Sequence, residues 1–444
     1  MFKTLRNAWN QPELRRKLLV TAIILILYRL GTAIPVPYFA AAPDSDVWTG
    51  NILEFFNILS GGALAQGTLL CLGVSPYITS SIVMQLLTVA IPKLGEKAKQ
   101  GEEGKKFVNF WTRIITVILA VITALGYALT AFRQGWTVWG TAEVDTWVQV
   151  WAISIMVICY CAGASIVMWL AEKINESGIG NGISMILFAG IITSIPSAVT
   201  QLWNTTFAGG DITKFQLGGF FLVLGVILGV VGLLFLIVWM SDGERRIPIQ
   251  YAKRVVGRKM YGGQNTNLPI KVNMSGVMPI IFASSIVSVP SLIAGMFFSS
   301  DSGFSVFVQN WFSQNTWPYL IVYFLLLLAF AYFYVAISFD PVEVGNNIKN
   351  NGGAILGIRP GAPTVSFIKK VLNRITLLGA LLVAVVACVP MIAGIIMGYC
   401  GVTTLTSIAV FGGSSMMIVI GVAIETMRDL EAQLSLRNYK GFLD

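Results

Sequence analysis

Long apolar runs alternate with short polar segments along the whole chain. Most runs reach about 18 residues or more, which is long enough for an α-helix to cross a hydrocarbon core of roughly 30 Å. The pattern predicts an all-α polytopic membrane protein with ten transmembrane helices. The expected spans are 18–37, 69–91, 107–131, 147–170, 183–203, 216–240, 274–298, 317–339, 371–397 and 405–425.

Composition agrees with this class and excludes several others. Of the 444 residues, 55% are hydrophobic and only 11% are charged, whereas soluble proteins carry about 25% charged residues. The chain has no histidine, which excludes HExxH zinc sites and the Ser-His-Asp and Cys-His pairs of hydrolases. The five cysteines lie in or beside apolar runs and are expected to pack as small hydrophobic residues. We therefore expect no enzyme activity, no metal site and no cofactor.

The 30 Lys and Arg residues predict the orientation of the spans. All but four lie in the N-terminus, the C-terminus or the loops after even-numbered spans, and the exceptions are Arg29, Arg113, Arg133 and Lys214. Cytoplasmic loops are rich in Lys and Arg, so both termini are expected to be cytoplasmic. Five spans in each half then give two inverted halves. The expected organisation is a cytoplasmic N-terminus 1–17, an N-terminal half 18–203, a C-terminal half 204–425 with cytoplasmic loops 241–273 and 340–370, and a cytoplasmic tail 426–444.

A short apolar segment, residues 51–66, follows the first span. It is too short to cross a bilayer, and it starts and ends on the outer side, so it is expected to be re-entrant or interfacial. Gly61 and Gly62 give it a flexible break. An amphipathic helix on the membrane surface is the alternative at this point.

Spans 2 and 7 each carry one polar stripe at helical spacing. Such stripes either hydrogen-bond between helices or line a wet path. Bulky aliphatic residues lie beside both stripes, and a polar path interrupted by such residues is a hydrophobic constriction that closes by excluding water. The stripes are Ser81, Gln85 and Thr88 on span 2, and Ser284, Ser288 and Ser291 on span 7.

Two function classes fit this arrangement, a passive channel and a secondary transporter for a small solute. No Asp, Glu or Lys falls in the middle of any span, where ion-driven transporters usually carry their relay charges, so the channel is favoured. The positive-inside rule and attraction to anionic lipid explain why the loops 241–273 and 340–370 are positively charged. Their length of about 30 residues suits a docking surface for an acidic partner or a phosphate backbone.

Eight separated motifs, in this order, resemble those of the SecY family, the channel subunit of the bacterial protein translocon. The motifs are RLGTAIPVP at 29–37, GGAL at 61–64, PYITSSIVMQLLT at 76–88, IGNGIS at 179–184, ERRIPIQYAKR at 244–254, LPIKVNMSGVMPIIFASS at 268–285, GIRPG at 357–361 and FGGSSMMIVI at 411–420. The resemblance implies a clamshell of two five-helix halves around an hourglass pore. It also implies a channel that passes unfolded secretory precursors and releases membrane segments laterally.

Site residues carried over from the family fall into four groups. The pore ring is Ile78, Ile82, Leu187, Ile191, Ile281 and Ile418, with Leu187 where the family often has Ile. The plug near 55–66 includes Phe55, Phe56, Leu59, Gly61, Gly62 and Leu64, and the two polar stripes become the sides of a lateral gate. The contacts for the driver of translocation are Arg246, Arg258 and Arg359.

The resemblance also implies partners and a location. The partners are the SecE and SecG subunits, the SecA motor or a translating ribosome with its RNA, polypeptides that bear signal sequences, and membrane lipid. The chain carries no GxxxxGK nucleotide-binding motif, so its energy must come from a partner or the proton-motive force. The expected location is the cytoplasmic membrane of a bacterium.

Overall fold

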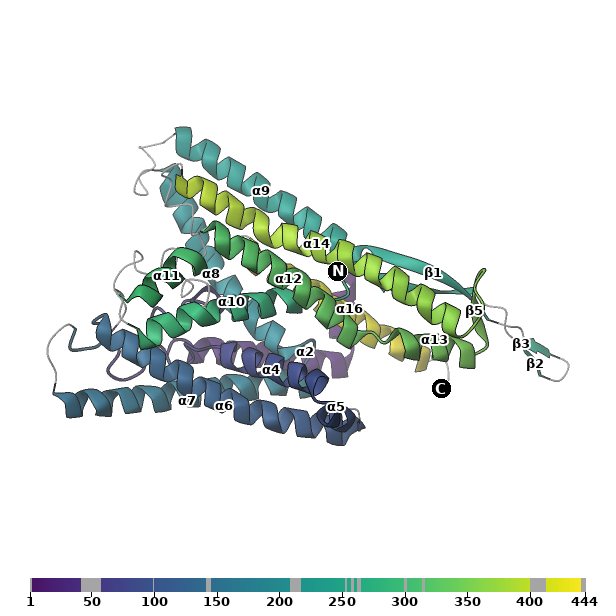
Figure 1. Cartoon of the computed structure of the whole chain (residues 1–444), viewed down its shortest axis with the longest axis horizontal. Helices are drawn as coiled ribbons and strands as arrows, with labels where there is room; N and C mark the ends of the chain where they lie inside the picture. Colours follow the sequence, from purple (N-terminus) through teal and green to yellow (C-terminus); the bar gives the residue numbers. More distant parts are fainter. Residues whose placement is uncertain are drawn as a thin grey trace.

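The computed structural model describes residues 2–40, 57–98, 100–140, 145–207, 217–251, 254–256, 259–261, 265–298, 302–313, 316–399 and 413–440. Long helices dominate and run roughly along the long axis of the molecule (Figure 1). The helices of the first half are α1 Phe2–Asn10, α2 Pro12–Gly31, α4 Ser75–Ala90, α5 Pro92–Ala98, α6 Gly101–Arg133, α7 Thr146–Ser177 and α8 Gly182–Thr206. Those of the second half are α9 Leu217–Asp242, α10 Met278–Phe297, α11 Gly303–Phe312, α12 Trp317–Ser338, α13 Pro341–Asn350, α14 Ala362–Tyr399 and α16 Ser414–Lys440.

Every predicted span overlaps a described helix. Some of these helices are too short or too polar to cross a membrane by themselves. Among the described residues, six helices are long and apolar enough to cross a membrane, or seven if the bent pair α4 and α5 forms one span. That pair bends by 111° at Ile91, the residue before Pro92, where the α conformation is disfavoured. The structure therefore supports a polytopic, mainly helical membrane protein.

The ends of spans 1, 2 and 10 differ from the sequence prediction. Helix α2 starts earlier and ends at Gly31, because the chain then becomes extended and Pro35 pairs with Thr68 in an antiparallel bridge. The same pairing delays the start of α4 to Ser75. The first part of span 10, residues 405–412, lies outside the described residues. Helix α16 continues through the expected boundary at 425 to Lys440.

The basic loops contain two small sheets that the all-α prediction missed, one of three strands and one of two (β2 with β3). The strands are β1 Glu244–Tyr251, β2 Arg254–Val256, β3 Lys259–Tyr261, β4 Asn265–Lys271 and β5 Gly353–Ile355. Strand β1 pairs antiparallel with both β4 and β5, so the loop 241–273 and the loop 340–370 share one sheet of order β4-β1-β5. Ile247 and Ile249 of β1 are buried against α13 and the start of α14. The expectation of an all-α protein is therefore corrected for these loops.

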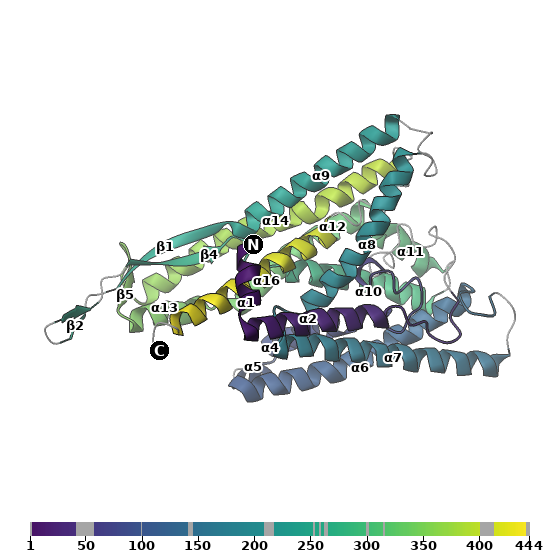
Figure 2. The ribbon, with the colours of Figure 1, turned by 180° about the vertical axis from the view of Figure 1, so that it is seen from behind.

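Both ends of the described chain lie on the same side of the helix bundle. Ala8 of α1 and Leu14 of α2 share a buried cluster with Leu430 of α16, and Lys17 Nζ of α2 donates a hydrogen bond of 3.1 Å to Gln433 Oε1. Figure 2 shows the N-terminal helix beside α16, with β1 and β4 at the same end of the molecule. A shared end for the two termini requires an even number of crossings.

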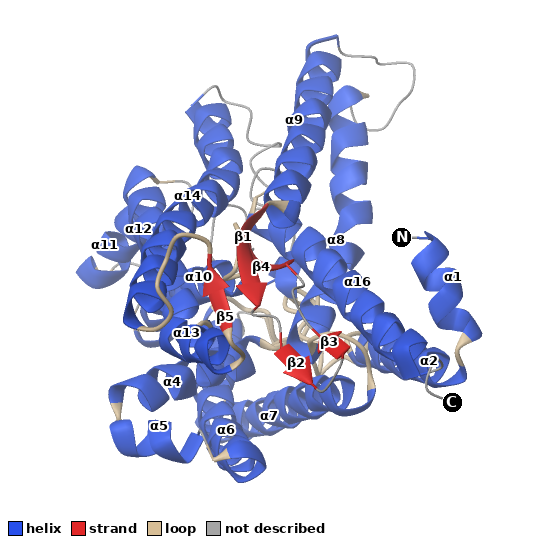
Figure 3. Cartoon of the chain, turned by 90° about the vertical axis from the view of Figure 1, so that its right-hand side faces the viewer, coloured by secondary structure: helices blue, strands red, loops and turns tan. Residues whose placement is uncertain are grey.

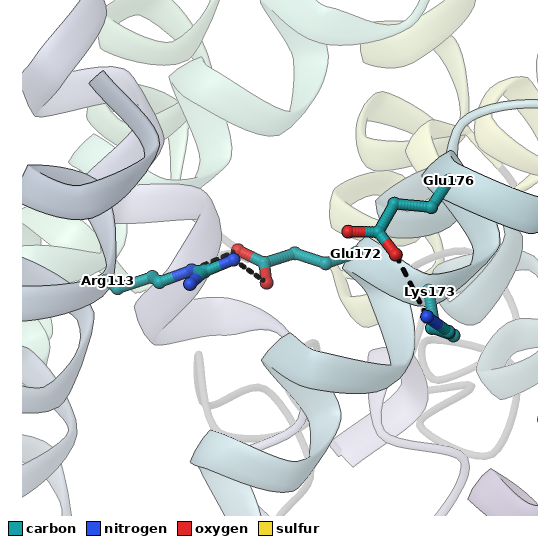
Figure 4. A network of polar contacts seen from close by, with 4 residues as sticks. All are labelled: Arg113, Glu172, Lys173 and Glu176. Carbon is teal, nitrogen blue, oxygen red and sulfur yellow. Dashed lines mark hydrogen bonds and ion pairs between the residues drawn. The ribbon is translucent and has the colours of Figure 1, made fainter. Parts of the chain in front are cut away.

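Arg113, one of the four basic residues outside the basic loops, is paired with a carboxylate (Figure 4). Its Nε and Nη2 donate to the two carboxylate oxygens of Glu172 on α7 at 2.9 and 2.7 Å. This fork geometry is the strong form of an Arg–carboxylate contact. Lys173 and Glu176 form a separate pair at 3.0 Å one turn further along α7. The charge inside span 3 therefore joins α6 to α7.

Candidate functional site

The six aliphatic residues expected to form the ring lie in one buried cluster. They come from helices of both halves, and each is at most 5% exposed. Ile78 and Ile82 are on α4 and Leu187 and Ile191 on α8, while Ile281 is on α10 and Ile418 on α16. The helical spacing of four residues puts each pair on one face of its helix. The fold therefore brings these side chains from four helices to one place.

The surroundings of the six residues extend the apolar cluster. Tyr28, Val74, Val277, Phe282 and Val422 are also buried members. No member of the cluster, among the described residues, carries a charged side chain. A closed aliphatic contact of this kind excludes water. Ions do not cross it, because they would have to give up their hydration shells. Sequence reasoning missed these outer members, although Val277 and Val422 lie four residues from Ile281 and Ile418.

The segment expected to be the plug is described from residue 57 onwards, and Phe55 and Phe56 lie outside the described residues. Residues 57–59 are helical, and the Gly62 N–H closes a turn on the Asn57 carbonyl at 2.8 Å. Leu59 packs against the aliphatic cluster. Leu64 belongs to a different cluster, and its carbonyl accepts a hydrogen bond from the hydroxyl of Tyr127 on α6. The segment therefore links the cluster to the packing of α6 and α7.

Close backbone contact holds this segment against α8. A Cβ added to Gly190 would lie 2.1 Å from the Leu59 carbonyl oxygen, so only glycine allows this approach. Gly61 has φ +71°, and a Cβ there would lie 2.4 Å from Thr193 Oγ1. Gly62, with φ +86°, meets no such obstacle. A side chain at Gly61 would collide with Thr193, and the positive φ of both Gly61 and Gly62 favours glycine at each position.

The two polar stripes do not hydrogen-bond to each other among the described contacts. Thr88 Oγ1 donates to the Gln85 carbonyl at 2.8 Å, and Gln85 Nε2 lies 3.5 Å from Ser81 Oγ. Ser284 and Ser288 are buried and likewise donate to carbonyls of their own helix, while Ser291 is half-buried. Helix α4 runs toward the end that bears the sheet, and α10 runs away from it (Figure 1). Gln85 and Ser288 therefore lie toward opposite ends of the bundle.

The contact between the halves at this seam is made by α10 with both α4 and α6. Helix α4 is fixed to α6 by Ser80, whose Oγ lies 2.6 Å from Thr116 Oγ1 and donates to the Thr112 carbonyl. At the far end, Arg133 Nη1 donates to the Phe298 carbonyl after α10 at 3.3 Å. Helices α4 and α6 thus form one side of the seam, and α10 the other.

The three basic residues expected to contact a driver have different surroundings. Arg246 on β1 forms an ion pair of 2.6 Å with Glu244 on the same strand. Arg359 is exposed, and its carbonyl accepts a hydrogen bond of 2.9 Å from Thr364 Oγ1. Arg258 lies outside the described residues. Figure 3 looks onto this end of the molecule, and Figure 1 shows that β2 and β3 project beyond the helix ends. Arg359 is therefore the free cation of the two that are described.

Comparison with known proteins gives the family. The sequence model of the SecY family matches residues 68–427. The protein translocase subunit SecY of Streptomyces coelicolor is 42% identical over 453 residues, and the match covers 100% of both chains. The SecY subunit of Corynebacterium glutamicum is 37% identical and covers 98% of this chain and 99% of its own.

Solved structures agree on the fold. A structure described as that of a protein conducting channel has a TM-score of 0.60 at 20% identity, covering 94% of this chain and 92% of its own. Sec61 from a canine ribosome-channel complex has a TM-score of 0.56 at 19% identity, with the same coverage. The match to the family model and the full-length relatives lead to one conclusion. The chain belongs to the SecY family of protein translocase subunits, and it is a protein-conducting channel.

Proposed function

We propose that the six-residue aliphatic cluster is the constriction of this channel and that it closes the path between the two halves. The observation that carries the proposal is the meeting of Ile78, Leu187, Ile281 and Ile418, from four helices of both halves, in one uncharged, buried contact. A translocating polypeptide would separate the halves and replace these contacts with its own side chains. After its passage the aliphatic contact would close again and exclude water.

The remaining parts of the site take roles around this constriction. The segment from Asn57 to Leu64 is the described part of a plug that rests on the cluster through Leu59. The seam between α10 and the pair α4 and α6 is the lateral gate through which apolar segments reach lipid. Ten crossings in two inverted five-helix halves, with both termini cytoplasmic, agree with the shared end of the termini and with the basic loops.

A transporter for a small solute is not supported, because the family is one of protein channels. An enzyme activity is not proposed, since the family is defined by translocation. The chain is proposed to act in the cytoplasmic membrane of a bacterium, with SecE and SecG as partner subunits and lipid around its apolar faces. The ribosome-bound Sec61 neighbour supports docking of a ribosome at the basic end, and SecA is the alternative driver.

Transport should depend on the exposed charge at Arg359. In proteoliposomes that contain this chain with SecE and SecG, a secretory precursor should enter the vesicles when SecA and ATP are supplied. Arg359→Glu should lower that uptake about tenfold or more, because it places a negative charge opposite an acidic partner surface and changes no packing contact. Assembly with SecE should be unchanged. The measurement is protease-protected precursor per channel.

Lys349→Glu is the matched control, because it makes the same charge change at an exposed position on neighbouring α13. It should keep most of the uptake if Arg359 is a specific contact. Equal loss in both variants would mean that only the total charge of the loops matters. Normal uptake by Arg359→Glu would remove Arg359 from the docking surface, and a wild-type complex that passes no precursor would overturn the proposed function itself.

A further inference from the structure

Arg29 is a cation near the end of the apolar helix α2. None of the ion pairs between described residues includes it. Its side chain instead reaches a segment 32 residues further along the chain, where Nη1 donates to the Gly61 carbonyl at 3.1 Å. The guanidinium group of Arg29, at the C-terminal end of α2, is thus directed at the proposed plug.

A local hydrogen-bond pair fixes the direction of this side chain. Arg29 Nη1 also donates to Thr32 Oγ1 at 3.2 Å, and Thr32 Oγ1 donates to the Arg29 carbonyl at 2.7 Å. Thr32 is only 3% exposed, so its hydroxyl is held in place by packing. The guanidinium is therefore anchored on its own helix while it binds Gly61.

The acceptor is held as firmly as the donor. Gly61 lies in the left-handed region at φ +71°, and Thr193 Oγ1 of α8 and Arg29 Nη1 of α2 both lie close to the position that a Cβ would occupy. A Cβ at this residue would lie 3.1 Å from the Gly190 carbonyl and 3.2 Å from Arg29 Nη1. Gly61 is thus held between α2 and α8, and its carbonyl points to the arginine.

The space beside Arg29 allows the bond to break. A pocket of about 370 Å³ opens at its side chain and is lined by Ile26, Arg29, Leu30, Thr32, Ala33 and Gln66. The guanidinium is exposed, so it can turn into this pocket without repacking the bundle. The acceptor is a neutral carbonyl, so separation leaves no unpaired buried anion behind.

We propose that Arg29 is the positioning residue that holds the plug in its closed place, through the Gly61 carbonyl. This inference rests on the proposed plug role of residues 57–64. Arg29 does not touch the aliphatic constriction or the passing polypeptide in this account. It sets how readily the plug leaves, and so how stringently the channel opens.

Resting ion conductance of the complex with SecE and SecG in planar bilayers tests the inference. Arg29→Gln should raise this conductance about tenfold, the factor expected when one hydrogen bond from a charged donor is lost. Arg29→Lys should restore much of the closure, because an ammonium group can donate to the same carbonyl. Gly61→Ala should also raise conductance, since its Cβ collides with Thr193 and displaces the segment. The double variant should leak no more than the stronger single variant.

Arg113→Gln is the matched control, because it removes an arginine from a membrane helix, and the partner of Arg113 is Glu172 on α7, outside the plug segment. It should lower thermal stability and leave resting conductance unchanged. If Gly61→Ala leaks and Arg29→Gln does not, the plug remains and Arg29 has no part in holding it. Additive leaks would also overturn the inference, since the two residues would then act separately. If neither variant leaks, the plug proposal fails together with it.

Discussion

Replacing Ile418 with asparagine is expected to make the resting channel leak ions and accept precursors with weak signal sequences. Ile418 is 1% exposed on α16 and lies in the cluster with Ile78, Leu187 and Ile281. An amide placed there has no described polar partner in the closed state, and an unsatisfied buried polar group costs about 1–3 kcal/mol. Water in an open constriction would satisfy it. The open population should therefore rise by about 5- to 150-fold.

The measurement is conductance in planar bilayers, together with uptake of a precursor that has a shortened signal sequence. Val386→Asn is the matched control, because Val386 is fully buried on α14 but belongs to the separate cluster of the second half. The control should lower stability to a similar degree without leakage. Similar leakage in both variants would show that general loosening of the bundle, and no specific seal, controls the path.

A disulfide across the seam between α4 and α10 is expected to abolish both secretion and membrane insertion, and reduction should restore both. The hydroxyls of the two stripes bond within their own helices, so between the described residues the closed seam is held by packing and by the Arg133 contact. An apolar signal segment can replace such contacts with its own. A covalent bond at the seam cannot be replaced.

Helix direction decides which cysteine pairs to test. Gln85 and Ser288 lie toward opposite ends of the antiparallel helices, so the pair is a poor choice at 1.5 Å of rise per residue. Positions level with the aliphatic cluster are better, and Tyr77 and Ser81 on α4 should be screened against Ser284 on α10. The native cysteines should first be replaced, because Cys71 is buried close to α4.

Ser80→Cys with Thr116→Cys provides the control for this experiment. Their hydroxyls are 2.6 Å apart, and both lie on the same side of the seam. That disulfide should form and leave transport intact. If cross-links between α4 and α10 form efficiently and transport continues, these helices are not a moving gate.

Much of the helical architecture could be predicted from the sequence, because a run of apolar residues in lipid has few choices other than a helix. Boundaries were less accurate where tertiary pairing competes. The bridge between Pro35 and Thr68 ends α2 early and delays α4, and no local pattern reports it. The sequence prediction missed the pairing of β1 with β4 in the same loop and the shorter pairing of β1 with β5, which lies about 100 residues away in another loop. The alternating Ile247 and Ile249 of β1 are the period-two signal that could have indicated a strand.

Some parts of the candidate site could be predicted from the sequence, and others could not. Ile78, Ile82 and Ile281 were indicated by their place beside the polar stripes, whereas family resemblance supplied the other three aliphatic residues, Leu187, Ile191 and Ile418. The polar stripes were correctly placed on helices, and the predicted orientation already makes spans 2 and 7 antiparallel, but the sequence does not give the depth of each stripe residue relative to the other helix. Contacts such as Arg29 to Gly61 and Arg246 to Glu244 need coordinates, since a charge does not reveal its partner.

The central claim is that a polypeptide crosses the membrane between the two halves, through the aliphatic constriction. A precursor with one cysteine, arrested partway through the channel, tests it most directly by disulfide formation. The account predicts cross-links from Ile191→Cys on α8 and Ile281→Cys on α10, one in each half, and none from Leu228→Cys, which is 64% exposed on the outer face of α9. Cross-links at Leu228 with none at Ile191 and Ile281 would contradict the account.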